Sequence, residues 1–175
     1  MDRFIILIGL MGAGKSNVGK RLAARLEMPF VDTDDEIELA AGCSIEDIFE
    51  EHGEAYFRDG ERRVIARLLD GEPAVMATGG GAFMNEETRR NLSAKGTVIW
   101  LRADLDLLLK RTRRRDNRPL LKQGDPRETL QSLIDRRYPI YGEADIIVDV
   151  REEPADSTTG RVLEELKAHH DRPDR

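Results

Sequence analysis

One glycine-rich motif near the N-terminus constrains the fold of this chain more than any other feature. Residues 9–16 read Gly-Leu-Met-Gly-Ala-Gly-Lys-Ser, a complete G-x-x-x-x-G-K-[ST] phosphate loop. An apolar run at residues 4–8 precedes the loop and a helix-like stretch follows it, which is the context that the motif requires. Backbone N–H groups of such a loop point at phosphate oxygens, and the helix adds its positive N-terminal end. The motif predicts a nucleoside triphosphate site, with Lys15 on the β- and γ-phosphates and Ser16 on Mg²⁺.

Composition and charge exclude several other classes of protein. The chain has 175 residues, a formal net charge of -6 and a single cysteine, Cys43. One cysteine cannot form an internal disulfide, which is typical of a reducing compartment, and the negative charge argues against a surface that coats nucleic acid. No stretch approaches the roughly 20 apolar residues of a membrane span, and the residues before the first apolar run fit neither a secretory signal nor a transit peptide. We expect a cytoplasmic monomer without nucleic-acid or membrane partners.

Short β-rich runs alternate with amphipathic stretches, a pattern that predicts an α/β fold. The expected strands are residues 4–8, 30–31, 74–77, 98–101 and 146–150. Because parallel neighbours need crossover helices, we expect a five-stranded parallel sheet flanked by helices, with ligands at the carboxyl ends of the strands. Three helix starts carry capping residues, which are Ser44, Asn85 and Asp104. The last helix is expected to end near Lys167, before a frayed tail.

An acidic pair stands where the second strand is expected to end. Asp32 and Asp34 are two residues apart in the run Val31-Asp32-Thr33-Asp34-Asp35, so an extended strand end would place both carboxylates on one side. Asp32 is then a candidate to hold Mg²⁺ through water, and Asp34 to accept a hydrogen bond, or a proton, from an acceptor hydroxyl. The alternative is that Asp34 only caps the following helix.

Glycines and arginines supply candidate contacts for a second substrate. Residues 79–81 are three glycines after a strand-like run, where bare backbone can approach a small ligand, although three glycines also suit a flexible turn. Arg58 is followed three residues later by Glu61, whose carboxylate can hold the guanidinium in one orientation. Arg137 stands near the end of another helix-like stretch. Two arginines at one pocket favour an anionic acceptor, whereas each alone is more often a surface charge.

A basic cluster at residues 110–118 interrupts an otherwise acidic chain. It can bind nucleic acid, or form a solvated helix face. A third interpretation fits the Gly- and Pro-containing loop that follows, namely a lid that closes over the triphosphate and excludes water. Arg118 is the arginine that such a lid is expected to bring to the developing charge.

In this order, the motifs resemble those of the shikimate kinase family over residues 4–150. The segments that carry the resemblance are residues 9–19, Asp32-Thr33-Asp34, Ser44-Ile45 with Ile48-Phe49, Gly53-Glu54 with Phe57-Arg58 and Glu61, residues 79–82, Arg118-Pro119-Leu120-Leu121, and Arg137 with Pro139 and Tyr141. The resemblance implies transfer of the γ-phosphoryl group of ATP to the 3-hydroxyl of shikimate, in the route to chorismate. It also implies a P-loop NTPase fold of the nucleoside-monophosphate-kinase type. A single kinase domain over residues 1–170 would then contain a shikimate-binding segment at 33–61 and a mobile lid at 112–125, before a disordered tail at 171–175.

The same resemblance assigns roles to individual residues. Those expected to be catalytic are Lys15, Asp34 and Arg118. Those expected to bind ATP are Gly12, Ala13, Gly14, Lys15, Ser16, Asn17, Arg111 and Arg118. Those expected to bind shikimate are Asp34, Phe49, Phe57, Arg58, Gly79, Gly80, Gly81 and Arg137. Those expected to hold Mg²⁺ are Ser16 and Asp32.

One departure and several alternatives accompany the resemblance. Asp59-Gly60 stands between Arg58 and Glu61, where a bulkier apolar residue is expected, and a helical glycine costs about 1 kcal/mol relative to alanine. The alternatives are a kinase of gluconate or of a nucleoside monophosphate, and a non-catalytic ATP-binding module. For Asp34, both general-base catalysis and simple orientation of the hydroxyl stay open, since an ordinary carboxylate is a weak base for an alcohol.

Overall fold

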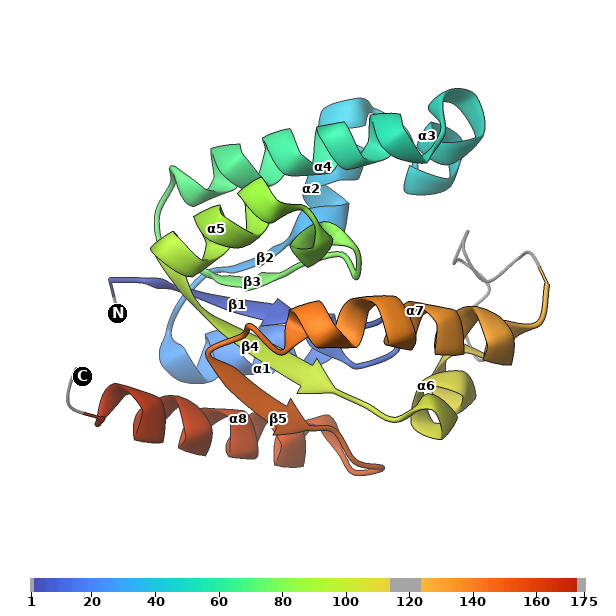
Figure 1. Ribbon diagram of the computed structural model, residues 1–175. Coiled ribbons are helices and arrows are strands. Elements are labelled where there is room, and N and C mark those ends of the chain that lie inside the picture. Colours follow the sequence, from blue (N-terminus) through green and yellow to red (C-terminus); the bar gives the residue numbers. More distant parts are fainter. Residues whose placement is uncertain (1, 114–123, 173–175) are drawn as a thin grey trace.

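The computed structural model describes residues 2–113 and 124–172, which form a parallel sheet with helices on both faces (Figure 1). The strands are β1 (Phe4–Ile8), β2 (Phe30–Asp32), β3 (Val75–Ala77), β4 (Gly96–Arg102) and β5 (Ile146–Asp149). Their order across the sheet is β2-β3-β1-β4-β5, and every neighbouring pair is parallel. The expected α/β fold with a five-stranded parallel sheet is therefore confirmed.

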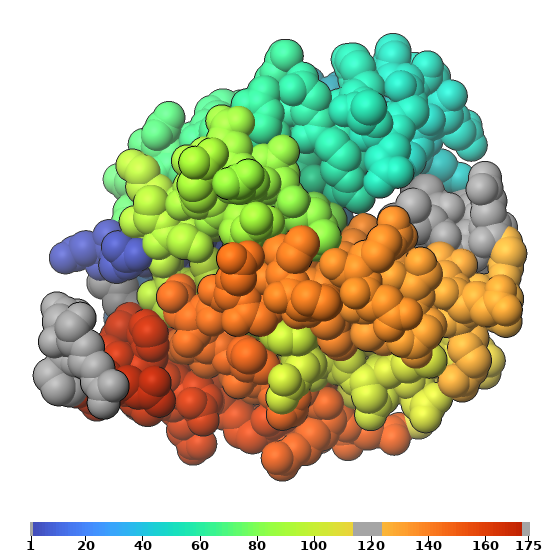
Figure 2. Space-filling view, in the orientation of Figure 1, coloured from blue at the N-terminus to red at the C-terminus, as the bar shows by residue number. Residues whose placement is uncertain are grey.

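Helices connect successive strands and cover the sheet. They are α1 (Lys15–Leu26), α2 (Thr33–Ala41), α3 (Ile45–His52), α4 (Glu54–Leu69), α5 (Glu86–Lys95), α6 (Leu105–Thr112), α7 (Pro126–Tyr141) and α8 (Ala155–His170), with a short 3-10 helix, η1 (Ala82–Met84). Helices α1 and α8 pack together on one face of the sheet, while α4 and α5 cover the other (Figure 1). Helix α7 lies beside η1 and α6. In the space-filling view, the surface of α3 and α4 faces that of α7 across a hollow (Figure 2).

Two hydrophobic clusters hold these layers together. All five residues of β1 are buried, as expected for a central parallel strand covered on both faces, and they belong to the main core with β3, β4 and the inner sides of α1, α5 and α8. A second, smaller cluster of Ile37, Ile48, Phe57 and Val64 lies between α2, α3 and α4. This second cluster fixes the three helices that carry several of the expected substrate contacts.

The capping residues act as the sequence predicts. Side-chain oxygens of Ser44, Asn85 and Asp104 each accept a hydrogen bond from a backbone N–H three residues on, at 2.8 to 3.1 Å. Helix α8 continues to His170, three residues beyond the expected end at Lys167. Basic side chains in its last turn interact favourably with the negative end of the helix dipole, which supports this extension. Among the described residues, no helix is both long enough and apolar enough to cross a membrane.

Candidate active site

The phosphate loop joins the carboxyl end of β1 to the N-terminus of α1. Gly12 and Gly14 have φ angles of 86° and 97°, in the left-handed region that a side chain disfavours. Helix α1 begins at Lys15 without an acidic residue in its first turn, so no carboxylate neutralises the positive end of its dipole. The Lys15 Nζ donates to the carbonyls of Gly9 at 2.7 Å and Leu10 at 3.1 Å, which holds the ammonium over the loop. This arrangement is suited to a bound phosphate chain.

Asp32 links the phosphate loop to the second strand. The Ser16 hydroxyl donates to Asp32 Oδ2 at 2.5 Å, and Asp32 Oδ1 accepts from the backbone N–H of Asp34 at 2.9 Å. Asp32 is therefore the N-cap of α2. The expectation of two carboxylates on an extended strand end was wrong, because this cap starts the helix at once and Asp34 lies in its first turn. The capping alternative for Asp34 was also wrong, since Asp32 makes that bond.

Asp34 nevertheless faces the glycine-rich end of β3. A Cβ built at Gly79 would lie 2.9 Å from both Asp34 Oδ1 and Glu61 Oε2, so both carboxylates approach the bare backbone there. The pKa of Asp34 is raised from 3.8 to about 6, mainly by burial and next by the negative charge of Asp32, while Lys15 lowers it. A carboxylate with this pKa is a better proton acceptor near neutral pH than an ordinary aspartate.

Arg58 and Glu61 form a buried ion pair beside Gly81. Arg58 Nη1 donates to Glu61 Oε1 at 2.9 Å, as the three-residue spacing predicts, and the Glu61 side chain is only 3% exposed. Burial raises the pKa of Glu61, and the charges of Arg58 and Arg137 act against that rise. A Cβ built at Gly81 would lie 2.5 Å from Cζ, Nη1 and Nη2 of Arg58. The guanidinium therefore rests flat on the glycine.

Arg137 reaches the neighbouring glycine from α7. It is only 6% exposed, and its Nη1 lies 2.9 Å from the position of a Cβ at Gly80. Burial lowers the pKa of Arg137, and the positive charge of Arg58 lowers it further. Two guanidinium groups from α4 and α7 thus lie against consecutive glycines. We call Asp34, Arg58, Glu61, Arg137 and the glycines 79–81 the carboxylate–arginine cluster.

The two expected aromatic contacts lie together beside this cluster. The rings of Phe49 and Phe57 are 4.8 Å apart, and the Arg58 guanidinium lies 5.0 Å from the Phe57 ring centroid. Phe57 is buried, whereas Phe49 is half-buried.

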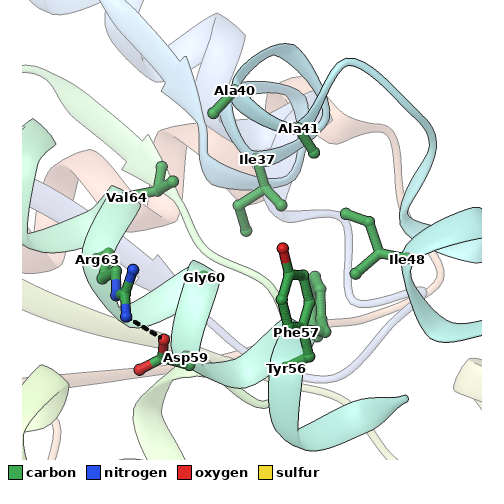
Figure 3. A pocket seen from close by; sticks show the side chains of 10 residues that line it. All are labelled: Ile37, Ala40, Ala41, Ile48, Tyr56, Phe57, Asp59, Gly60, Arg63 and Val64. Atoms are coloured by element: carbon green, nitrogen blue, oxygen red, sulfur yellow. Dashed lines mark ion pairs between the residues drawn. The ribbon is translucent and has the colours of Figure 1, made fainter. Parts of the chain in front are cut away.

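A separate pocket of about 240 Å³ opens between α2, α3 and α4, and it shares only Phe57 with the expected substrate contacts (Figure 3). Apolar side chains such as Ile37 and Ile48 point into it, and the Asp59–Arg63 ion pair lies beside Gly60 in its wall. The glycine that departs from the family pattern therefore borders this pocket and not the carboxylate–arginine cluster.

Two side chains of the basic cluster, Arg111 and Lys110, make contacts with other parts of the chain. Arg111 donates to the carbonyls of Gly12 at 3.2 Å and Ala13 at 3.3 Å, so its side chain crosses the phosphate loop. Lys110 forms an ion pair with Glu152. Arg118 and most of the expected lid at 112–125 lie outside the described residues.

The structure thus gathers most of the expected residues at one end of the sheet. The phosphate loop, Asp32, Asp34, Arg58 and Arg137 adjoin one another through the contacts above. Asn17 is exposed and accepts a hydrogen bond from Arg21, so its side chain turns along α1 and away from the loop. Two supporting contacts were not predicted from the sequence. The Thr33 hydroxyl accepts from the Gly79 N–H at 3.2 Å, and the Tyr141 hydroxyl donates to the Gly80 carbonyl. The four-residue spacing of Arg137 and Tyr141 puts both on one helix face, but it does not indicate Gly80 as the partner of Tyr141.

A phosphate loop at the centre of a five-stranded parallel sheet, next to a carboxylate and two arginines, defines a small-molecule kinase of the P-loop class. The family model of shikimate kinase matches residues 11–167. A shikimate kinase of Paramagnetospirillum magneticum is 62% identical over 171 residues, covering 98% of this chain and 88% of that protein. One of Bradyrhizobium diazoefficiens is 56% identical over 167 residues, covering 95% and 81%. The chain belongs to the shikimate kinase family.

A solved structure agrees with this result. The shikimate kinase of Acinetobacter baumannii in complex with shikimate superposes with a TM-score of 0.93 at 37% identity, covering 97% of this chain and 96% of that one. The fold and the ATP-dependent kinase activity expected from the sequence are therefore confirmed at the level of the family.

Proposed function

We propose that this chain transfers the γ-phosphoryl group of ATP to the 3-hydroxyl of shikimate, giving shikimate 3-phosphate and ADP. Membership of the shikimate kinase family and the shikimate complex of a relative support this proposal. The observation that carries it to particular residues is the carboxylate–arginine cluster, where two carboxylates and two guanidinium groups converge on three glycines. A compact acid with several hydroxyl groups has the chemistry that such a site binds.

In the proposed acceptor site, Arg58 and Arg137 bind the shikimate carboxylate. Guanidinium groups pair with carboxylates through two parallel hydrogen bonds. Both arginines lie against glycines, which have no side chain to displace them. Phe49 and Phe57 line one side of the site. Gly79, Gly80 and Gly81 have no side chains of their own that would keep a small ligand from the backbone.

Asp34 accepts the hydrogen bond of the reacting hydroxyl and takes its proton as the bond to phosphorus forms. The pKa of about 6 makes Asp34 mostly ionised at neutral pH yet more basic than a solvated aspartate. Its neighbours Asp32 and Glu61 favour uptake of that proton, since both raise its pKa. Protonation of Asp34 therefore relieves its repulsion with the carboxylates of Asp32 and Glu61.

The phosphate loop positions ATP and neutralises its charge. Lys15, the N-terminus of α1 and the backbone of Gly12, Ala13 and Gly14 face the phosphates, while Asn17 at the start of α1 stands close by. Arg111 borders the nucleotide from α6, and we expect Arg118 to reach the phosphates from a lid at 112–125. Phosphoryl transfer passes through a loose transition state, so positioning and charge neutralisation account for most of the rate.

Ser16 and Asp32 fit a magnesium ion. A hydroxyl and a carboxylate in direct contact at 2.5 Å present the oxygen ligands that Mg²⁺ prefers, with water and phosphate oxygens completing the shell. A magnesium ion held by these residues would offset the negative charge of the phosphates. Asp32 would then exchange its bond from Ser16 for contact with the hydrated ion while it continues to cap α2.

The proposed organisation is a single kinase domain over residues 1–170, with an acceptor-binding segment at 33–61 and a tail at 171–175. We further propose that it acts as a cytoplasmic monomer on small-molecule substrates, without nucleic-acid or membrane partners. The negative net charge and the single cysteine support this.

The decisive experiment is a coupled ADP-release assay with Mg·ATP and shikimate, gluconate, AMP or no acceptor, followed by mass detection of the product. We expect release that depends strictly on shikimate. Release with another acceptor would retain the nucleotide site and refute the acceptor assignment. No release with any acceptor would favour a non-catalytic module.

Variants of the two arginines test the acceptor site itself. Arg58→Ala and Arg137→Ala are expected to weaken shikimate binding with little effect on ATP binding. Matched controls are Arg63→Ala, an exposed arginine on α4, and Arg136→Ala, an exposed neighbour on α7, which should leave both affinities unchanged. Wild-type shikimate affinity in both site variants would remove the basis for the assignment.

A further inference from the structure

We infer that Tyr141 is a positioning residue of the acceptor site, because its hydroxyl holds the Gly80 carbonyl and interacts with the Arg137 guanidinium. This inference rests on the proposed role of Arg137 in binding the acceptor carboxylate. Tyr141 itself does not touch the acceptor. It acts by fixing the two groups that do.

The hydrogen-bond chemistry of the three groups leaves one arrangement. Tyr141 is fully buried at the end of α7, one turn after Arg137. Its hydroxyl donates to the Gly80 carbonyl and is near enough to the Arg137 guanidinium for each group to affect the pKa of the other. A carbonyl only accepts and a guanidinium only donates. The phenol proton therefore goes to Gly80, and the phenol presents only its oxygen to Arg137, which suits a group that can only donate. Burial raises the pKa of Tyr141 to about 12, so the proton stays on the hydroxyl at neutral pH.

Arg137 needs such a partner because no carboxylate holds it. Within residues 2–113 and 124–172, no acidic side chain lies within 4.0 Å of its guanidinium, and Glu61 acts on it only at longer range. The like charge of Arg58 is near enough to lower its pKa, so repulsion opposes the convergence of the two arginines. Arg58 is held in place by Glu61. On α7, Tyr141 has the corresponding role of holding Arg137 in place.

The same hydroxyl also sets the orientation of the glycine backbone. The carbonyl of Gly80 belongs to the peptide group that continues to Gly81, and in a planar trans peptide the C=O and N–H point in opposite directions. Holding this carbonyl toward Tyr141 therefore directs the Gly81 N–H away from it. Glycine backbone is otherwise free to rotate, so this contact removes a freedom that the three consecutive glycines introduce.

Tyr138 offers a matched control on the same helix. Its ring packs against Trp100 at 4.8 Å between centroids, and that of Tyr141 packs against Trp100 at 5.6 Å. The Tyr138 hydroxyl also donates to a backbone carbonyl, but that of Ala103, outside the carboxylate–arginine cluster. Replacing either tyrosine by phenylalanine removes one buried hydroxyl and keeps the ring. Only the loss at Tyr141 affects Arg137 and Gly80.

The test compares Tyr141→Phe with Tyr138→Phe by ADP-release kinetics, by calorimetric titration with shikimate and by thermal unfolding. For Tyr141→Phe we expect KM and Kd for shikimate to rise about tenfold, the equivalent of about 1.4 kcal/mol, with KM for ATP unchanged within about twofold. For Tyr138→Phe, both constants should stay within about twofold of wild type. Equal shikimate affinity in folded Tyr141→Phe and wild type would overturn the inference.

A double-mutant cycle separates positioning from general destabilisation. If Tyr141 acts through Arg137 as well as through Gly80, then Tyr141→Phe should cost clearly less shikimate affinity in the Arg137→Ala background than in the wild type. An equal tenfold loss in both backgrounds would show that the hydroxyl does not act through Arg137 and would overturn the inference. Failure of the wild-type protein to bind shikimate would instead refute the proposed function, so the two failures are distinguishable.

Discussion

A single methyl group at Gly81 should separate acceptor binding from folding. The φ angle of Gly81 is -93°, which alanine adopts without strain. A Cβ there would lie 2.5 Å from three atoms of the Arg58 guanidinium, and ordinary contacts are about 3.5 Å, so the guanidinium must move by about 1 Å. Arg58 is a flexible side chain that is 28% exposed. It can therefore swing outward while the backbone keeps its place.

That movement weakens the ion pair with Glu61 and the binding of the acceptor. A shift of about 1 Å stretches the 2.9 Å bond from Arg58 to Glu61 beyond hydrogen-bond range, and a bond of this charged kind contributes about 1.5–3 kcal/mol. Because Arg58 also leaves the position from which we propose that it contacts the acceptor, we expect KM for shikimate to rise about 10- to 100-fold. The free energy of unfolding should fall by only about 1–2 kcal/mol, since Arg58 regains water.

The assay is ADP release at varied shikimate and at varied ATP, with thermal unfolding of the same samples. Gly60→Ala is the matched control, because Gly60 lies in the same helix as Arg58 and a Cβ there meets nothing within 4 Å. We expect unchanged shikimate and ATP constants in Gly60→Ala and an unchanged ATP constant in Gly81→Ala. A folded Gly81→Ala protein with wild-type KM for shikimate would refute the inferred contact between Arg58 and the acceptor.

Three further predictions follow from the same geometry. Lys15→Met should lower kcat at least about 1000-fold and leave the fold intact. Lys20→Met, on the exposed side of α1, is the control and should leave kcat unchanged. Steady-state kinetics measures kcat, and circular dichroism checks the fold. Asp34→Asn should abolish most activity yet raise the free energy of unfolding at pH 8: the folded-state pKa of Asp34 lies above its unfolded value, so its ionised form costs stability above pH about 6 and this cost disappears below about pH 4. Accordingly, wild-type kcat/KM should fall as pH drops through about 6, and a flat profile between pH 5 and 8 would contradict this role. Gly42→Ala, at φ 72° with open space around it, should destabilise the protein by about 1 kcal/mol, while Gly60→Ala should stabilise it by up to about 1 kcal/mol in a thermal or denaturant titration.

The elements that the sequence predicted well are those with local causes. The phosphate loop, the three capping residues and the central strands follow from turn geometry and hydrophobic pattern, which act over a few residues. Strand β4 was predicted too short because the prediction followed the apolar run at residues 98–101, whereas Gly96 is disfavoured in strands and Thr97 and Arg102 are polar. Gly96 is required there for another reason, since a Cβ would lie 2.6 Å from Ile6 Cδ1 on the paired strand.

The candidate site shows the same division between local and distant causes. The three-residue spacing of Arg58 and Glu61 predicted their ion pair, but the burial of Glu61 depends on the packing of α4 against the sheet. The strand-end geometry of Asp34 was wrong because the sequence pattern did not reveal that Asp32 caps α2. The bond from Tyr141 to Gly80 joins residues 61 positions apart, and no local pattern specifies such a partner.

The second hydrophobic cluster has a thermodynamic consequence for the segment that carries Asp34 and Arg58. Its four buried members, Ile37, Ile48, Phe57 and Val64, stand apart from the main core, and α3 contributes one buried residue alone. Few buried contacts mean a low free energy of local opening. Backbone amides of α2 and α3 should therefore exchange with deuterium sooner than those of β1 and β4. Part of the free energy of acceptor binding is then used to order this unit, and saturating shikimate should slow its exchange selectively.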